Sequence, residues 1–377
     1  MKTENKEKNN DMISDLPDCV LLYILSLLNT KDAVQTCILS TRWKNLWKNL
    51  PTLRLNSTHL ETFQSFAKFV YGILSLRDST TSLHILDFHR SGIIWPSLLK
   101  KILKYAVSHN VQRLNINVSD VVSHLPSCLF SCQTLTSLNL SFKYATVLFP
   151  YALNLPALTN LSLKCLIFCA GDDGRVEPFS TLKLLNSLII KYCKVRDAQN
   201  LCISSVTLVN LTMISCPYSF TEFKFELSTP CLLKFKFWGI PIQKLCGSNN
   251  NLYSTKHVDI NVAMVLNSMD TPFLLLKWLA ELANIESLIV SVTTLQVLSI
   301  VPDLFKVEFP FLRNLKSLKV KLRDIELEQA VAMSQTEAVE LGVAFDAEFE
   351  PFSFVPDGII DFLIQNSPFV DVNIIDF

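Results

Sequence analysis

The stretch LTSLNLSFKYATVLFPYALNLPALTNLSL, residues 135–163, holds two copies of one short pattern, apolar-x-x-apolar-x-apolar, placed 23 residues apart. The pattern recurs along most of the chain at intervals of 23–30 residues, and its central positions are Leu86, Leu114, Leu138, Leu161, Leu188, Leu211, Phe235, Val258, Leu288 and Leu318. Such a period indicates a solenoid of stacked strands, because a single copy is too small to bury its own apolar residues.

Alternate side chains of each predicted strand point into the core, and those between them line a concave face. The pattern therefore predicts an α/β fold, in which an irregular arc of parallel strands follows a three-helix module and precedes an α+β cap. A second match, at Leu295, Leu298 and Ile300, overlaps the copy centred on Leu288 and leaves the register open over residues 285–300.

The concave-face positions change character along the predicted arc. Early copies place small polar residues there, whereas late copies place lysines and one tryptophan. We predict a target-binding surface formed by Lys164, Lys191, Lys234, Lys236, Trp238, Lys319 and Lys321. Trp238 is expected to be exposed and to act as an anchor, because interface hot spots favour tryptophan. The alternative is a solvated face on which the lysines only keep the strands soluble.

The segment LPDCVLLYILSLLNTKDAVQTCILSTRWKNLWKNLP, residues 16–51, does not fit the repeat. It predicts three helices: one over residues 19–28, one beginning after Thr30, and one after Ser40 that carries Trp43, Leu46 and Trp47. The first helix is apolar nearly all round. A module of under fifty residues cannot cover such a helix, so either the repeat array or another protein must do so.

Composition and charge narrow the class of protein. With 377 residues, 49% of them apolar and 18% charged, the chain is neither disordered nor fibrous. Its formal charge of zero argues against nucleic-acid binding, which needs a concentrated positive surface. The zero is an average, however. Residues 323–377 carry twelve acidic residues and one basic residue, so we predict that this tail competes for the late lysines or that an acidic target segment binds them.

No motif in the sequence indicates catalysis or a cofactor. There is no Gly-rich phosphate loop, no nucleophile elbow, and no spacing of His and Cys typical of a metal site. We therefore expect a non-catalytic binding protein without a cofactor or metal. Eleven cysteines without a readable secretory signal indicate reduced thiols, and no segment is typical of a membrane span, so the expected location is the cytoplasm, the nucleus or both.

The segment 16–51 resembles an F-box, and specifically the plant type that precedes irregular leucine-rich repeats. The resemblance rests on Leu16-Pro17, Val20-Leu21, Ile24-Leu25-Ser26, Lys31-Asp32-Ala33, Leu39-Ser40, Arg42-Trp43 and Leu46-Trp47. The repeats resemble leucine-rich repeats, and Cys193 and Cys216 stand where that family allows Asn or Cys. The segment FVPDGIIDFLIQNSP, residues 354–368, is similar to the end of plant F-box proteins that carry an FBD segment, here in degenerate form.

The resemblance implies a domain order: a disordered start (1–10), an F-box (11–58), leucine-rich repeats (59–322) and an acidic, FBD-like cap (323–377). It also implies that the F-box docks on a Skp-type adaptor, and through it on a cullin, while the repeats hold an unidentified target protein for an SCF-type ubiquitin ligase. The adaptor contacts implied are Leu16, Pro17, Val20, Leu21, Ile24, Leu25 and Leu28, with Trp43, Leu46 and Trp47 as the F-box core. Two alternatives stay open: a co-receptor for a hormone-like small molecule, and a repeat scaffold without a ligase role.

Overall fold

The computed structural model describes residues 13, 16–57, 62–119, 122, 124–144, 146–171, 174–198, 200–215, 224–241, 245, 252–262, 270–282, 284–306, 312–322, 354–367 and 369–375. The chain divides into two compact units, Met1–Ser119 and Asp120–Phe377. Within the described ranges, no helix is long and apolar enough to cross a membrane.

The first unit begins with the predicted helical module. Its helices are α1 (Asp18–Leu27), α2 (Thr30–Gln35), η1 (Thr36–Ile38), α3 (Trp43–Leu46) and η2 (Trp47–Asn49). Pro17 precedes α1, where its missing N–H costs nothing. Asn29 caps α2, because its side chain accepts a hydrogen bond from the Asp32 N–H. The three helical segments expected from the sequence are therefore present.

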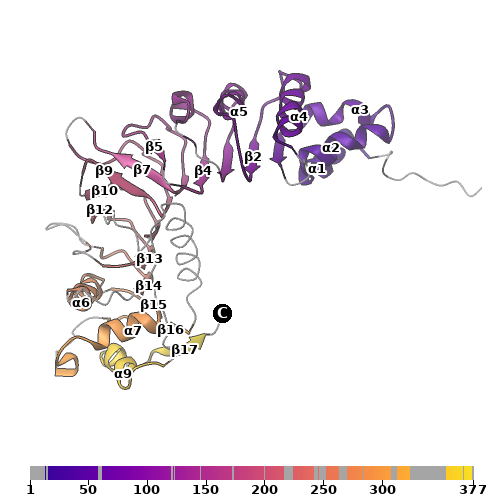
Figure 1. The fold of residues 1–377 in the computed structure, drawn as a ribbon. Helices are drawn as coiled ribbons and strands as arrows, with labels where there is room; N and C mark the ends of the chain where they lie inside the picture. The colour runs from indigo at the N-terminus through magenta and orange to yellow at the C-terminus, as the bar shows by residue number, and fades with distance from the viewer. Residues whose placement is uncertain are drawn as a thin grey trace, which may run out of the picture. The chain divides into compact units, whose positions relative to one another are not determined.

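Three parallel strands follow in the same unit: β1 (Thr52–Asn56), β2 (Ile85–Arg90) and β3 (Arg113–Val118) (Figure 1). The return segments are helices, α4 (Phe63–Leu76) and α5 (Pro96–Ser108). Leu53 pairs with Leu86, which pairs with Leu114, so the central leucines of the repeat form one row. The strand stacking thus begins with β1, inside the range 11–58 that was assigned to the F-box.

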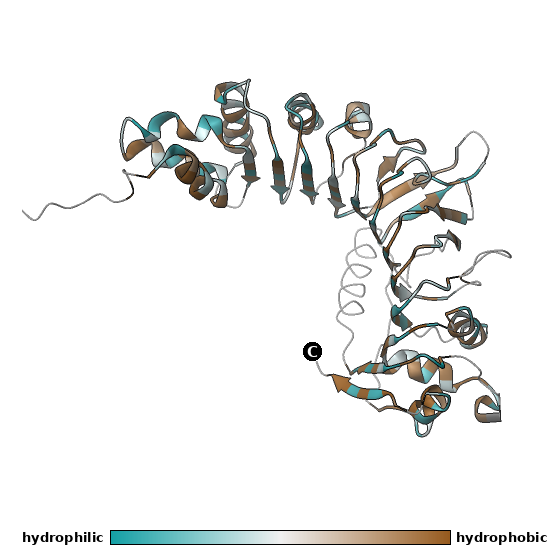
Figure 2. Cartoon of the chain, turned by 180° about the vertical axis from the view of Figure 1, so that it is seen from behind, coloured by the Kyte–Doolittle hydropathy of each residue, from teal (hydrophilic) through white to brown (hydrophobic). Residues whose placement is uncertain are grey.

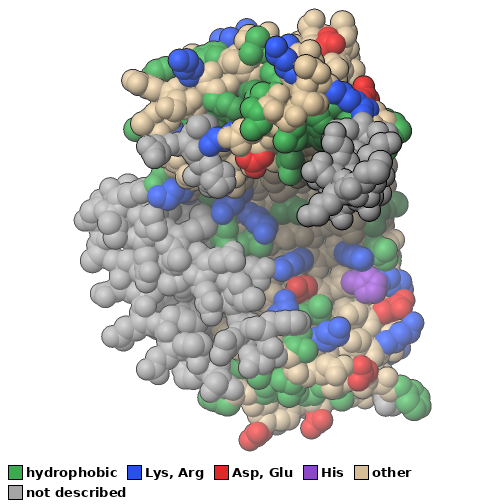
Figure 3. Space-filling view, turned by 90° about the vertical axis from the view of Figure 1, so that its right-hand side faces the viewer, with side chains coloured by type: hydrophobic (Ala, Val, Ile, Leu, Met, Phe, Trp, Pro, Cys, Tyr) green, Lys and Arg blue, Asp and Glu red, His purple; other side chains and the backbone are tan. Residues whose placement is uncertain are grey.

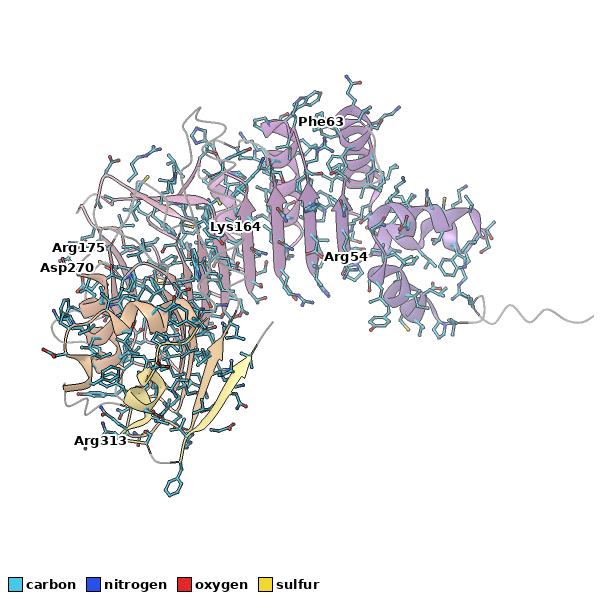
Figure 4. All side chains as sticks on the ribbon, turned by 60° about the horizontal axis from the view of Figure 1, so that its bottom comes forward. Arg54, Phe63, Lys164, Arg175, Asp270 and Arg313 are labelled. Carbon is cyan, nitrogen blue, oxygen red and sulfur yellow. The ribbon has the colours of Figure 1, made fainter. Side chains whose placement is uncertain are left out.

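The helical module is bonded to these strands through the backbone. The Arg54 N–H donates to Thr30 Oγ1 over 2.8 Å, and the Arg54 side chain lies 3.4 Å from Asp87 (Figure 4). The buried Arg77 guanidinium donates twice to the Leu50 carbonyl, over 2.9 and 3.1 Å. A buried charge needs such partners, so Arg77 fixes the junction between module and strands.

The second unit continues the parallel pairing. Its main sheet runs in the order β4 (Ser137–Phe142), β6 (Asn160–Lys164), β8 (Ser187–Lys191), β11 (Asn210–Ile214), β13 (Lys234–Gly239), β14 (His257–Val262), β15 (Ser287–Ser291), β16 (Ser317–Lys321) and β17 (Asp371–Ile375). The predicted central residues fall in one row of the register, extended by Val372 on β17. The predicted α/β fold, an F-box followed by an arc of parallel strands, is confirmed.

The return segments of the second unit differ from one another. Early ones hold η3 (Ser127–Ser131) and short parallel strands, namely β5 (Val147–Phe149), β7 (Leu166–Cys169), β9 (Lys194–Arg196), β10 (Asn200–Ser204) and β12 (Lys224–Ser228). Later ones hold α6 (Thr271–Glu281), α7 (Val292–Ser299), η4 (Leu304–Lys306) and α9 (Ile359–Ile364). In Figure 2 apolar and polar residues alternate along the main strands, as one buried face requires.

The structure settles the register near residue 290. Leu288 lies on β15, and the overlapping match at Leu295 and Leu298 lies on helix α7. Ser291 ends the strand and caps the helix, because its side chain accepts a hydrogen bond from the Thr294 N–H. The predicted disordered start (1–10), residues 323–353 of the acidic tail and Cys216 lie outside the described residues.

Candidate functional site

Helix α1 presents two different faces. Leu21 and Leu25 are buried in the module, on the side of the helix that faces its core. The reason is the helical period: residues four apart share a face, and this face packs on the rest of the module. Trp43, Leu46 and Trp47 are also buried. Of the remaining implied contacts, Pro17 is exposed and Leu16 is half-buried.

The other face of α1 leaves large apolar side chains in solvent. The exposed fractions are 38% for Val20, 66% for Tyr23, 38% for Ile24, 61% for Leu27 and 38% for Leu28. Ile38 and Leu39, after α2, are exposed as well. We call the five residues from Val20 to Leu28 the α1 face. Soluble surfaces rarely keep so many large apolar residues on so short a segment, so this face is the strongest interaction candidate in the first unit.

The sequence had not assigned two members of the α1 face, Tyr23 and Leu27, to a site, nor the exposed Ile38 and Leu39. A helical wheel over residues 18–27 could have found the first two, because they lie opposite the Leu21 and Leu25 face. The N-terminus of α1 is held by Arg42, which donates to both Asp18 Oδ1 and the Leu16 carbonyl. The Arg42–Asp18 pair is solvent-exposed, so it orients the helix more than it stabilises the fold.

The predicted target-binding lysines lie on the main sheet of the second unit. Lys164 and Lys191 are adjacent in the register, and Lys164 Nζ lies 5.7 Å from the centre of the Tyr192 ring (Figure 4). Lys234 is exposed, and Lys319 is half-buried. The structure thus places these lysines along one series of neighbouring strands. Figure 3 shows basic and acidic side chains interspersed on one face of the molecule.

Two of the late lysines are paired within the chain. Asp259 lies 2.9 Å from Lys321 Nζ and 3.8 Å from Lys236 Nζ. The Asn261 Nδ2 group donates to Asp259 as well, over 3.0 Å. Because Asp259 and Lys321 are mostly buried, their pair is held more firmly than a surface ion pair. Asp259 therefore reduces the positive charge that Lys236 and Lys321 offer to a partner.

The prediction that Trp238 is exposed was wrong. Its side chain is 0% exposed, and its neighbours in the same register row, Ile214 and Asn261, are buried too. The strand end is also packed closely: Ser215 donates to the Trp238 carbonyl, and Gly239 takes φ 149° with no room for a Cβ beside the Ser215 hydroxyl. The alternation of buried and exposed residues fails at this row, so Trp238 cannot be a surface anchor.

Cysteine and metal chemistry have no site among the described residues. Those residues hold no cluster of His, Cys, Asp or Glu fit for a metal ion, and their nine cysteines are free thiols. Cys193 fits its expected structural position, with its Sγ 3.4 Å from the Lys191 carbonyl and 3.7 Å from the Leu163 carbonyl. Burial raises the pKa of the Cys193 thiol to about 12, so it stays protonated at neutral pH.

Comparisons with known proteins agree with this arrangement. The F-box domain family matches residues 13–55. F-box/LRR-repeat protein 13 of Arabidopsis thaliana is 32% identical over 211 residues, 54% of this chain and 46% of that protein. A putative F-box/FBD/LRR-repeat protein of the same plant is 38% identical over 164 residues, 41% of this chain and 37% of that protein. Another F-box/FBD/LRR-repeat protein is 26% identical over 336 residues, 82% of this chain and 71% of that protein.

The helical module and the strand arc thus define a class: an F-box domain joined to leucine-rich repeats. The resemblance to plant F-box/leucine-rich-repeat proteins is confirmed, since the chain carries the F-box and is similar to F-box/LRR-repeat and F-box/FBD/LRR-repeat proteins of Arabidopsis thaliana. In the first two of these matches the chain spans less than half of the relative's length.

Proposed function

We propose that this protein is the substrate-recognition subunit of an SCF-type ubiquitin ligase. In this proposal the F-box docks on a Skp-type adaptor, and through it on a cullin, while the repeats bind the target protein. The role is non-catalytic: holding the target beside a charged ubiquitin-conjugating enzyme raises its effective concentration there.

The observation that carries the proposal is the α1 face. Burying a Leu, Ile or Val side chain contributes about 1.5–3 kcal/mol relative to leaving it exposed. Val20, Ile24 and Leu27 obtain only part of that gain within the chain. A partner that covers the α1 face would supply the rest, and the F-box match over residues 13–55 supports an adaptor as that partner.

Co-purification tests the docking step. The full chain is expected to co-purify with a Skp-type adaptor and cullin, and Ile24→Asp is expected to abolish the association, because a carboxylate would be buried unpaired at the interface. Leu184→Asp is the matched control, since Leu184 is an exposed apolar residue of the repeats. The proposal fails if the folded wild-type chain does not bind, or if Ile24→Asp binds as well as Leu184→Asp.

The proposed target-binding surface contains fewer residues than the sequence alone predicted. Of the predicted set, Trp238 is buried, and Asp259 engages Lys236 and Lys321. The lysines that best fit an acidic target segment are therefore Lys164, Lys234 and Lys319. Exchange of these three for Gln should weaken target binding and reduce its salt dependence, because each lost charge removes a screened attraction.

A repeat scaffold without a ligase role makes a different prediction. Deletion of residues 11–58 would leave a scaffold functional, whereas it would separate a substrate receptor from the ligase and trap its target undegraded. Affinity purification with such a deletion is also the most direct way to identify the target. The deletion has to spare strand β1 (Thr52–Asn56), which pairs with β2, and Leu50, whose carbonyl accepts from Arg77, so removal of residues 11–49 is the better design.

A further inference from the structure

Strand β17 closes the sheet order of the second unit among the strands that the structure describes. It pairs with β16 on one side, with Leu318 opposite Val372 and Val320 opposite Ile374. An edge strand with free backbone groups is a template for pairing with another strand, and proteins usually protect such edges with charges, prolines or covering segments. On β17, the exposure of the apolar side chains and the direction of the backbone groups distinguish a protected edge from an open one.

The core row of the sheet is uncovered at β17. In the preceding strands, the inward residues of the two core rows are almost fully buried, as Leu318 and Val320 are on β16. On β17 the equivalent Val372 is only half-buried, and Ile374 is 56% exposed. Phe369, just before the strand, is 94% exposed. The apolar surface that each strand normally gives to the next one is therefore left in solvent at β17.

The backbone groups of β17 that do not bond to β16 point to the open edge of the sheet. The Asp371 N–H donates to the Lys316 carbonyl, and the Ile375 carbonyl accepts from the Leu322 N–H. Residues of a parallel strand direct their N–H and C=O groups to alternate neighbours, so the odd-numbered residues of β17 bond to β16. The N–H and C=O groups of Val372 and Ile374 consequently point to the open edge. Hydrogen bonds and apolar contacts are thus available to one incoming strand.

Charge indicates what kind of strand fits. The described residues 354–367 and 369–375 contain Asp357, Asp361 and Asp371, all exposed, and no lysine or arginine. The strand already paired with β17 is β16, whose sequence SLKVK alternates apolar residues with lysines. Because the repeat is translational, a strand of the kind that fits one edge of β17 also fits the other edge.

We propose that the open edge of β17 binds an extended segment of a partner protein in which apolar residues alternate with Lys or Arg. The segment adds a parallel strand to the sheet. Its apolar residues cover Val372 and Ile374, its backbone bonds to theirs, and its basic side chains lie beside the acidic terminal region. This mode of recognition is strand addition, in which backbone bonds supply affinity and alternate side chains supply specificity. It is independent of the proposed docking of the F-box.

The probe for this site is a fluorescein-labelled peptide with the sequence of residues 312–322, LRNLKSLKVKL, added to the full chain and followed by fluorescence anisotropy. Saturable binding is expected. A peptide carrying Lys316→Glu, Lys319→Glu and Lys321→Glu is expected to bind at least about tenfold more weakly, because it brings like charges to the acidic edge.

The decisive variant of the protein is Ile374→Pro. Proline is tolerated on an edge strand where its missing N–H faces solvent, so the pairing of β17 with β16 and the melting temperature should be retained. The variant removes an outward N–H and part of the apolar surface, and at least about tenfold weaker peptide binding is expected. Asn373→Ala is the control, because it leaves the charge of the edge unchanged and Asn373 lies on the opposite face of the strand from Val372 and Ile374.

Three results would overturn the proposal. The first is no binding of the basic peptide by the folded chain, and the second is equal binding by wild type and Ile374→Pro. The third is self-association: if sedimentation shows the chain alone forming dimers that Ile374→Pro abolishes, the occupant of the edge is a second copy of this chain. Monomeric wild type together with Ile374-dependent peptide binding supports the proposal.

Discussion

The inward face of the repeats and the outer face of helix α1 are built from the same residue types, yet they differ in solvent exposure. Leu188, on strand β8, is 0% exposed because β6 and β11 lie on either side of it. Leu27 on α1 is 61% exposed. An apolar residue of the repeats is buried by the neighbouring strands. An exposed apolar residue on α1 can be buried only by a partner that binds this face. The first contributes to folding and the second is available for binding.

The largest expected effect separates the two regions directly. Leu188→Ala leaves a cavity between two strands and should lower the free energy of unfolding by about 2–5 kcal/mol. Leu27→Ala removes an exposed side chain and should change it by no more than about 0.5 kcal/mol. Urea unfolding followed by circular dichroism measures both. A large loss for Leu27→Ala would show that the α1 face already has a cover within the chain.

Substitution of two glycines by alanine should have opposite effects on stability, each smaller than the effect of Leu188→Ala. Gly239 has φ 149°, and a Cβ there would lie 1.9 Å from Ser215 Oγ, so Gly239→Ala should cost at least about 1–3 kcal/mol. Gly72, inside helix α4, has no heavy atom within 4 Å of the Cβ position, so Gly72→Ala should stabilise the first unit by about 0.5–1 kcal/mol. Thermal melts of the two variants should therefore shift in opposite directions, and shifts of the same sign would contradict this assignment.

Chemical labelling of cysteines tests the difference between buried and exposed side chains without a substitution. Burial raises the pKa of Cys193 to about 12 from the ordinary 9.0. At pH 8 roughly a tenth of an ordinary thiol is thiolate, against about one part in ten thousand for Cys193. Iodoacetamide should therefore label the exposed Cys19 and Cys231 in the native chain, and Cys193 only after unfolding. Peptide mass spectrometry of native and urea-treated protein reads the difference.

The raised pKa of Cys193 also determines the direction in which stability changes with pH. Between pH 9 and 12 the unfolded chain loses the Cys193 proton while the folded chain keeps it, so this thiol's contribution to stability falls as pH rises through that window. Cys193→Ala removes that contribution. The difference in unfolding free energy between wild type and Cys193→Ala should therefore shift against the wild type above pH 9, and a constant difference from pH 8 to 11 would contradict the burial of the thiol.

The repeat could be predicted from the sequence because its signal is periodic. Ten central residues at intervals of 23–30 fixed the strands, and the pairing rows reproduce them. Position on a strand does not fix exposure, however. Trp238 occupies a concave-face position but is buried, as are Ile214 and Asn261 beside it. A strand pattern carries no information on what covers the ends of the strands.

The F-box helices were predictable from their start signals and apolar faces, whereas the exposure of their individual residues was not. Residue identity alone placed Leu21 and Leu25 with Val20 and Ile24, although the helical turn puts the first two in the core. The ion pair of Asp259 also could not be predicted from the sequence. Asp259 reaches Lys321 across an intervening strand, a contact between residues 62 apart in the chain that only the folded register creates.

The smallest expected effect concerns a surface carboxylate. Glu286 accepts hydrogen bonds from Lys316 over 2.7 Å and lies 3.2 Å from Lys256 Nζ, and these two lysines hold the pKa of Glu286 below its usual value of 4.5. A lowered pKa means that the pairing stabilises the fold above pH 4.5, and that this contribution is lost as pH falls through the folded-state pKa. Because Lys316 is largely exposed, the gain is small and screened by salt.

Lys316→Met should accordingly lower the melting temperature slightly at pH 7 and low salt, and the difference from wild type should shrink both below pH 4 and in molar salt. Lys277→Met, on the exposed side of helix α6, is the matched control and should show no such pH dependence. A difference that persists at pH 3 would mean that Lys316 stabilises the arc through packing of its aliphatic stem rather than through its charge.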